Sequence, residues 1–159
     1  MGDSGRVLSA DLVEFFESGV SILVATRDAR LHPACGRAMG AQVQSAARVV
    51  TVFIPEVTSS HTVANLRDNR RIAVTFARPL THYAIQIKGT CQAIRASGEA
   101  ERAVQMRYRA AYTEQLHAVG MPRPATARLV WWPSLALDVL VQDLFVQTPG
   151  PTAGRRLEA

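Results

Sequence analysis

The chain has 159 residues, of which 48% are hydrophobic and 19% charged, and this composition excludes a disordered or collagen-like protein. Its length predicts one domain with a sizeable core. The formal net charge is +5, and a mildly basic surface suits anionic small molecules as well as nucleic acid; because Lys88 is the only lysine and the arginines are scattered, we expect no nucleic-acid partner.

The N-terminal residues show no recognisable targeting signal. An acidic residue comes early, no long apolar segment follows, and Arg6 stands where a myristoylation motif requires Ser or Thr. No apolar run is long enough to cross a bilayer, so we expect no membrane partner.

Cysteine and histidine usage predicts neither disulfides nor a metal site. Cys35 and Cys91 form no CxxC pattern, which fits a reduced, cytoplasmic protein with two small buried hydrophobic residues, although adjacent strands could bring the two together. The four histidines have no ligand-like spacing; they are His32, His61, His82 and His117.

The first predicted elements are a helix and two strands. Ser9 is a candidate N-cap for a helix over residues 10–18. Residues 20–27 are apolar with little alternation, which predicts a strand buried on both faces. Residues 32–44 predict one further strand, in which glycines and alanines surround Arg37. This strand is either a floor for a flat ligand or a bulged edge strand with an arginine facing solvent.

The central stretch, residues 49–76, predicts a strand, a hydroxyl-rich turn, a short helix and a second strand. The apolar run VVTVFI ends at Pro55, a short helical pattern has Val63 and Leu66 on one face, and residues 71–76 are again typical of a strand. Ser59 or Ser60 is the candidate N-cap. The hydroxyls, His61 and the amides of the first turn would together suit a phosphate; the alternative is a capped helix that binds nothing.

The remaining elements are three strands and the longest helix. Residues 83–95 alternate, and Gly89 indicates a bend or bulge of the kind that barrels need. Ser97 is a candidate cap for a helix that reaches about Val119, and we interpret His117 near its end as structural. Strands are predicted over 128–132 and 137–148, and a disordered tail from residue 151.

The order of these elements predicts the fold class. About seven strands and three helices, joined mostly by turns too short for parallel crossovers, favour an antiparallel barrel with helices at its ends. Residues 1–150 would form this single domain. Neither GxGxxG nor GxxxxGK[ST] occurs, so the usual glycine-rich nucleotide loops are absent from the sequence.

Three motifs in this order resemble one known family. They are SILVATRDARLHPACGR, VTVFIPEVTSSHTVANLRDNRRIAVTF and AIQIKGTCQAI, which together span about residues 20–97, and the ending VQTPGPTAG is also similar. They resemble the pyridoxamine 5′-phosphate oxidase-like, FMN-binding split-barrel superfamily. The resemblance implies an α+β fold built on a split β-barrel, and a homodimer with FMN sites at the subunit interface.

The resemblance also implies the site residues. Arg37 and Ser60, with Ser59 beside it, fall where the family contacts the FMN phosphate. The chain departs from the oxidases where neutral side chains replace basic ones, at Gln42, His61 and Thr62. The isoalloxazine would lie along the second and third strands, against Met39, Gly40, Val52 and Ile54. Trp131 or Trp132 could reach the ring from the partner subunit; the alternative is that both belong to the core and the interface.

Two functions stay open at this point. The first is an FMN-dependent oxidoreductase of unknown small-molecule substrate, in which the cofactor supplies the redox chemistry, and no catalytic residue can be named. The second is a non-enzymatic split barrel that holds haem, another flavin-like ligand or nothing. The missing cations around the phosphate favour the second.

Overall fold

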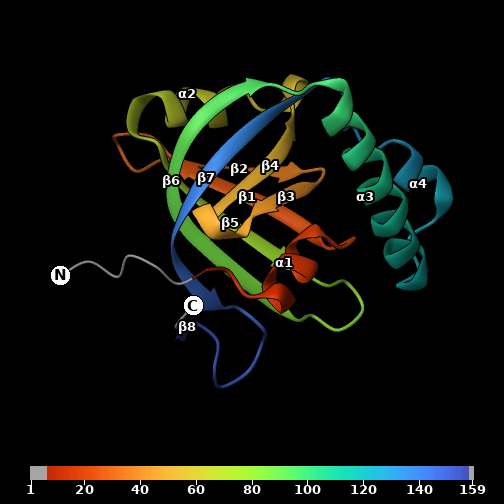
Figure 1. The fold of residues 1–159 in the computed structure, drawn as a ribbon. Helices are drawn as coiled ribbons and strands as arrows, with labels where there is room; N and C mark the ends of the chain where they lie inside the picture. Colours follow the sequence, from red (N-terminus) through yellow and green to blue (C-terminus); the bar gives the residue numbers. More distant parts are fainter. Residues whose placement is uncertain (1–6, 158–159) are drawn as a thin grey trace.

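The structure is a computed structural model, and it describes residues 7–157. Within that range one antiparallel sheet of eight strands curls into a barrel, with helices at its ends and along one side (Figure 1). The strands are β1 (Ser21–Arg27), β2 (Pro33–Ala38), β3 (Ala41–Gln44), β4 (Val49–Pro55), β5 (Arg71–Ala77), β6 (Ala84–Ala96), β7 (Ser134–Val146) and β8 (Arg156–Leu157). The α-helices are α1 (Ala10–Glu17), α2 (Ser60–Asn69), α3 (Glu99–Ala118) and α4 (Arg123–Ala127). The predicted α+β split-barrel class is confirmed.

The barrel is split where β2 passes into β3. The strand order is β2-β1-β5-β6-β7-β4-β3, so β2 and β3 lie at opposite ends of the sheet although only Met39 and Gly40 separate them. Two backbone hydrogen bonds join this point to Phe53 of β4. The Met39 amide donates to the Phe53 carbonyl (2.7 Å), and the Phe53 amide donates to the Gly40 carbonyl (3.1 Å). The single strand predicted over residues 32–44 is therefore wrong. Gly40 has φ +135°, which breaks the strand and which other residues rarely adopt.

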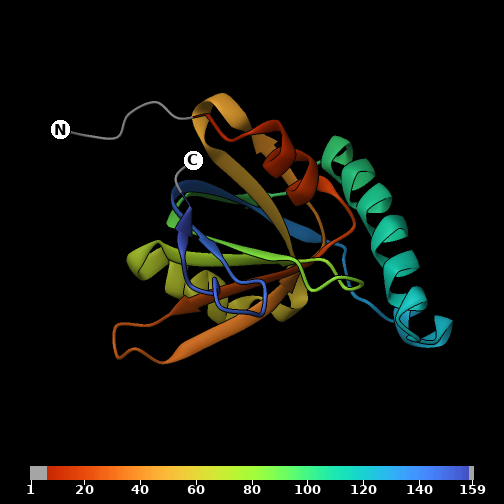
Figure 2. The same ribbon diagram turned by 90° about the horizontal axis from the view of Figure 1, so that it is seen from below.

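The two longest strands, β6 and β7, bend around the barrel (Figures 1 and 2). Their pairing shifts register between Lys88 and Gly89 and again between Cys91 and Ala93. The bulge predicted at Gly89 is confirmed. A Cβ at this position would collide with the carbonyl oxygen of Leu140, so the close approach of β7 requires glycine.

The core fills the barrel, and α1 covers one end of it. Phe16 of α1 is fully buried, with its ring centroid 4.3 Å from that of Phe76. The Ser9 hydroxyl accepts from Leu12 N (3.4 Å), which confirms the predicted cap. The expectation that β1 is buried on both faces is wrong, because only alternate residues point inward and Leu23 is 40% exposed on the outer face.

The segment before β7 differs from the prediction. Residues 128–132 form no strand; instead Pro122 caps the short helix α4, with proline in its first turn, and β7 begins at Ser134. At the start of α3, the residue that caps is Gly98, whose amide donates to the Glu101 carboxylate (2.8 Å). The Ser97 hydroxyl accepts from Ser134 and caps nothing.

The C-terminal residues also differ from the predicted disorder. The chain turns back after β7, and Val146 N donates to the Arg155 carbonyl (2.9 Å). β8 then pairs with β7, with Leu157 packed against the core. Residues 158 and 159 lie outside the described range. No helix between residues 7 and 157 is long and apolar enough to cross a membrane.

Candidate functional site

The start of α2 follows directly from the end of β4. A 3₁₀ turn over Glu56–Thr58 connects the two, and Ser59 takes the N-cap position. Its hydroxyl does not cap the helix as predicted, because it donates to the Pro55 carbonyl (2.6 Å). α2 begins at Ser60, directly after the predicted N-cap position, and the hydroxyl-rich residues form its first turn.

The first turn of α2 offers several unused donors. Val63 N bonds the Ser59 carbonyl (2.9 Å), but the amides of Ser60, His61 and Thr62 have no acceptor within residues 7–157. Ser60 and His61 are exposed, and Thr62 is buried. Free amides at the positive end of a helix favour an anion.

Arg37 is already engaged by the protein. Its Nη1 donates to the Ser21 hydroxyl (2.9 Å) and to the Tyr112 hydroxyl of α3 (2.5 Å), and its Cζ lies 5.6 Å from the Tyr112 ring centroid. It is paired across the sheet with Leu23, on the outer face of the barrel. No interaction joins it to Ser60, His61 or Thr62 in the described structure.

Three of the side chains predicted to face a flavin lie in the hydrophobic core. Met39, Val52 and Ile54 are each no more than 1% exposed. This follows from the barrel, because alternate residues of β4 point inward and Met39 turns in at the split.

The other two predicted positions lie under α3. Gly40 is in contact range of Gln105, and Gln42 is exposed beside a shallow groove of about 320 Å³ between β3 and α3. Gln105 is fully buried; its Nε2 donates to the Ser134 hydroxyl (2.9 Å), whereas its Oε1 has no hydrogen-bond partner. Helix α3 thus covers the split between β2 and β3.

The tryptophan pair packs beside α3 of its own chain. The ring centroids of Trp131 and Trp132 lie 6.1 Å apart, and Arg102 Cζ lies 6.0 Å and 5.5 Å from the two rings. Trp131 is half-buried and packs against the core.

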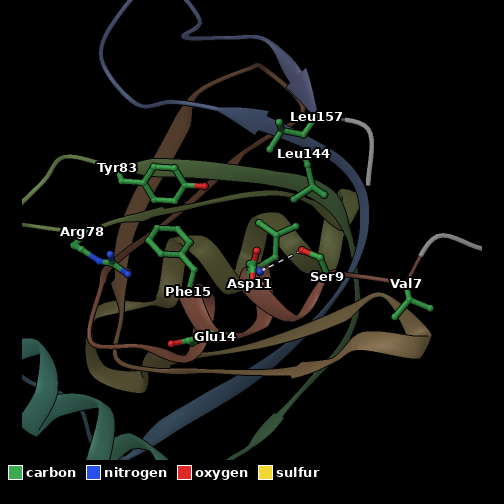
Figure 3. Close-up of a pocket in the computed structure, with 10 residues that line it drawn as sticks. Val7, Ser9, Asp11, Glu14, Phe15, Arg78, Tyr83, Leu144 and Leu157 are labelled. Carbon is green, nitrogen blue, oxygen red and sulfur yellow. Dashed lines mark hydrogen bonds between the residues drawn. The ribbon is translucent and has the colours of Figure 1, made fainter.

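A separate cavity of about 570 Å³ lies between α1, the β5–β6 loop and β8 (Figure 3). Phe15 and Tyr83 meet edge to face at 4.8 Å, and Arg78 Cζ lies 5.5 Å from the Phe15 ring centroid. None of the predicted site residues lines it. Among residues 7–157 there is also no group of three or more side chains that could hold a metal ion.

The comparisons with known proteins decide the family. The family model described as "Pyridoxamine 5′-phosphate oxidase" matches residues 8–132. The chain belongs to this family. No curated protein matches it.

Solved structures share the fold of this family member at low identity. HupZ of Group A Streptococcus is 19% identical, with 92% of this chain and 99% of that chain covered and a TM-score of 0.55. A Lactobacillus delbrueckii protein described as a candidate pyridoxamine 5′-phosphate oxidase is 14% identical (91% and 98% covered, TM-score 0.54). An FMN-binding protein from Syntrophomonas wolfei is 12% identical (85% of each chain, TM-score 0.51).

The residues at the start of α2 fit a phosphate ester as neutral donors. Three amides and the Ser60 hydroxyl are free to donate, and Thr62 and His61 stand beside them. Arg37, which the resemblance implies at the phosphate, is held by Tyr112 and Ser21 and makes no contact with this turn within the described residues.

Sequence reasoning missed the part that α3 plays. Tyr112 and Gln105 fall on the helix stripe that periodicity assigns to the core, and both are buried. Their polar atoms are what periodicity does not explain, since the Tyr112 hydroxyl accepts from Arg37 and the Gln105 amide donates to Ser134. The single signal in the sequence was a polar glutamine and a tyrosine hydroxyl on an otherwise apolar stripe.

Proposed function

We propose that this member of the pyridoxamine 5′-phosphate oxidase family binds FMN beside the split between β2 and β3, and that it is an oxidoreductase of a small-molecule substrate. The observation that carries the proposal is the first turn of α2, where three amides and the Ser60 hydroxyl have no acceptor within residues 7–157. The resemblance described above also implies that this turn contacts the FMN phosphate.

Each residue has a stated part in this proposal. The amides of Ser60, His61 and Thr62 hold the phosphate, and Arg37 supplies its one full positive charge. The exposed Gln42 borders the ring, whereas Gly40 lies under α3, and Met39, Val52 and Ile54 support that wall from the core. A bound FMN would supply hydride chemistry at its N5 atom, and the protein's contribution is to bind and orient it.

We further propose a cytoplasmic homodimer. Both cysteines are free, which suits a reducing compartment. In a dimer with sites at the interface, Trp131 of one subunit would border the site of the other; large aromatic side chains are enriched at such interfaces.

A second candidate is a split barrel without catalytic activity that holds haem, another flavin-like ligand or nothing. The engagement of Arg37 by Tyr112 supports it, because the phosphate would then meet only neutral donors. Core burial of Met39, Val52 and Ile54 supports it as well.

The test is the absorbance spectrum of the purified protein, followed by titration with FMN. The proposal predicts flavin bands or saturable FMN binding, and Arg37→Ala should weaken the Kd about tenfold, as expected for a charge-assisted hydrogen bond. Arg123→Ala, which removes an exposed charge from α4, is the control. A Soret band, or no binding with FMN in large excess, would favour the second candidate.

A further inference from the structure

A second concave surface, the outer groove, lies on the outside of the barrel. It is formed by the ends of β1 and β5, the bulge of β6 and the facing part of β7, and it encloses about 670 Å³. That volume is in the range of small-molecule sites, about 300–1,000 Å³. No residue of the proposed FMN site lines it.

Three cationic side chains surround the outer groove: Arg27, Arg71 and Lys88. The sheet register explains why they share a face. Ala73 of β5 is paired with Lys88 on one side and with Ala25 on the other. Arg71 lies two residues before Ala73, and Arg27 lies two residues after Ala25. Residues two apart in a strand point to the same face, so the three cationic side chains share it. Like charges on neighbouring strands repel, and an anion bound between them would relieve that repulsion.

These charges have few partners within the chain. Neither Arg71 nor Lys88 makes a hydrogen bond or ion pair through its side chain within residues 7–157, and the Lys88 ammonium lies 4.8 Å from the Phe145 ring centroid. The Arg27 guanidinium donates only to a carbonyl, that of Asp28 (3.1 Å). The donors of all three side chains therefore remain largely available to a ligand.

The one carboxylate in the groove does not neutralise them. Asp143 lies directly across the sheet from Lys88, but its ion pair is with Arg156 of β8. The C-terminal end of α2 also reaches the groove, and its partial negative charge amounts to less than one full charge. The surface potential of the outer groove is thus positive.

The floor of the outer groove is made of small residues. Ala25 and Ala73 lie on it, and Gly89 has no side chain at all. A ligand can therefore approach the sheet closely, while Thr90 and Gln142 offer polar groups around the rim.

We infer that the outer groove binds a phosphate-bearing small molecule. Arg27 and Arg71 each carry a planar guanidinium group, which can donate two parallel hydrogen bonds to two oxygens of a phosphate group. The Lys88 ammonium adds a compact positive charge. The organic part of the ligand would lie on the alanine floor. This inference does not rest on FMN binding, because the groove lies at the C-terminal end of α2 and the proposed FMN phosphate seat at its N-terminal end, about 14 Å away along ten residues of helix.

The test is isothermal titration of the full-length protein with inorganic pyrophosphate at low ionic strength. We expect saturable binding with a Kd below about 1 mM, weakened about five- to tenfold by Arg71→Ala or Lys88→Ala. Both side chains are exposed, so the variants should keep the fold, which circular dichroism checks. Arg123→Ala on α4 removes the same charge elsewhere and should leave the Kd unchanged. Asp143→Asn should tighten binding, because it releases Arg156 and removes the only carboxylate of the groove.

Four results would overturn the inference. The first is no saturable binding of pyrophosphate by the wild-type protein. The second is an equal loss in Arg123→Ala and Arg71→Ala, which would indicate attraction to net charge alone. The third is tight, steeply salt-dependent binding of a single-stranded oligonucleotide that the groove variants abolish, which would assign the groove to a polymer. The fourth is competition between FMN and pyrophosphate that depends on Arg37, which would assign pyrophosphate binding to the FMN site.

Discussion

The two ends of helix α2 use charge in opposite ways. At its N-terminal end, which we propose holds the FMN phosphate, the donors are neutral amides and hydroxyls, and Arg37 of the proposed site is held by Tyr112. At its C-terminal end, the outer groove presents Arg71 and Lys88 without carboxylate partners within residues 7–157. The difference indicates that a family motif suggests where to look for a site, whereas the charges available for binding are found from the pairing of side chains in the structure.

The largest expected effect comes from the bulge that shapes the outer groove. Gly89→Ala places a Cβ against the Leu140 carbonyl, and we expect a loss of about 3 kcal/mol or more in the free energy of unfolding, since neither strand can move aside. Gly36→Ala is the matched control, because nothing lies within 4 Å of its added Cβ, and it should be neutral or slightly stabilising. Chemical denaturation measures both. Equal stabilities would mean that β6 and β7 do not approach as described.

The next-largest expected effect concerns Arg37, which belongs to the proposed FMN site at the N-terminal end of α2. Tyr112→Phe removes the hydroxyl that holds Arg37, so we expect FMN to bind about threefold more tightly while stability falls by about 1–2 kcal/mol. Tyr108→Phe is the control, since that hydroxyl donates to the Val20 carbonyl (2.6 Å) and touches no proposed site residue. Weaker FMN binding in Tyr112→Phe would show that Tyr112 positions Arg37 for the ligand and does not withhold it.

A smaller effect concerns the anchoring of α3, which carries Tyr112. Hydrogen bonds from Arg95 (2.6 and 2.9 Å) hold the pKa of the Glu101 carboxyl below its usual range. A carboxyl whose pKa is lowered by folding stabilises the protein above its unfolded pKa and loses that contribution as the pH falls through its folded pKa. Glu101→Gln should therefore cost about 1 kcal/mol at neutral pH, and the two stability curves should converge in acid.

The matched control for this pH dependence is Glu99→Gln. Glu99 is 81% exposed and lies 3.6 Å from Arg102, so its replacement should change stability little at any pH. A constant difference between wild type and Glu101→Gln down to acid pH would contradict the role assigned to the Arg95 pair.

The smallest effect tests the faces of the sheet. Cys91 is buried, and burial raises the pKa of its thiol to about 11, whereas Cys35 is exposed on β2. Iodoacetamide at mildly basic pH should label Cys35 alone, and Cys91 only after unfolding, because the thiolate is the reactive form. Mass spectrometry with Cys35→Ala as control measures this. Equal labelling rates in the folded protein would contradict the described orientation of the strands.

The sequence predicted those features that depend on neighbouring residues. The Ser9 cap, the bulge at Gly89 and the antiparallel order of the strands follow from local patterns. The hydrogen-bond partner of the Ser59 hydroxyl could not be predicted, because it depends on how β4 meets α2. Helix α4 was not predicted, because prolines are as typical of a residue that ends a helix or strand as of the first turn of a helix.

The candidate site was harder to predict because long-range contacts determine it. Arg37 and Tyr112 are 75 residues apart in the chain, and only the packing of α3 brings them together. Which residues of β4 face inward depends on the register of the closed barrel, so the burial of Val52 and Ile54 could not be assigned from their type. The outer groove likewise draws on four strands, whose charges are dispersed in the sequence.

The most direct test is one FMN titration of three proteins: wild type, Arg37→Ala and Arg71→Ala. The account predicts that wild type binds FMN, that Arg37→Ala weakens binding about tenfold, and that Arg71→Ala leaves it unchanged. Loss of FMN binding in Arg71→Ala with full binding in Arg37→Ala would place the flavin phosphate in the outer groove, and would contradict the assignment of the two ends of α2.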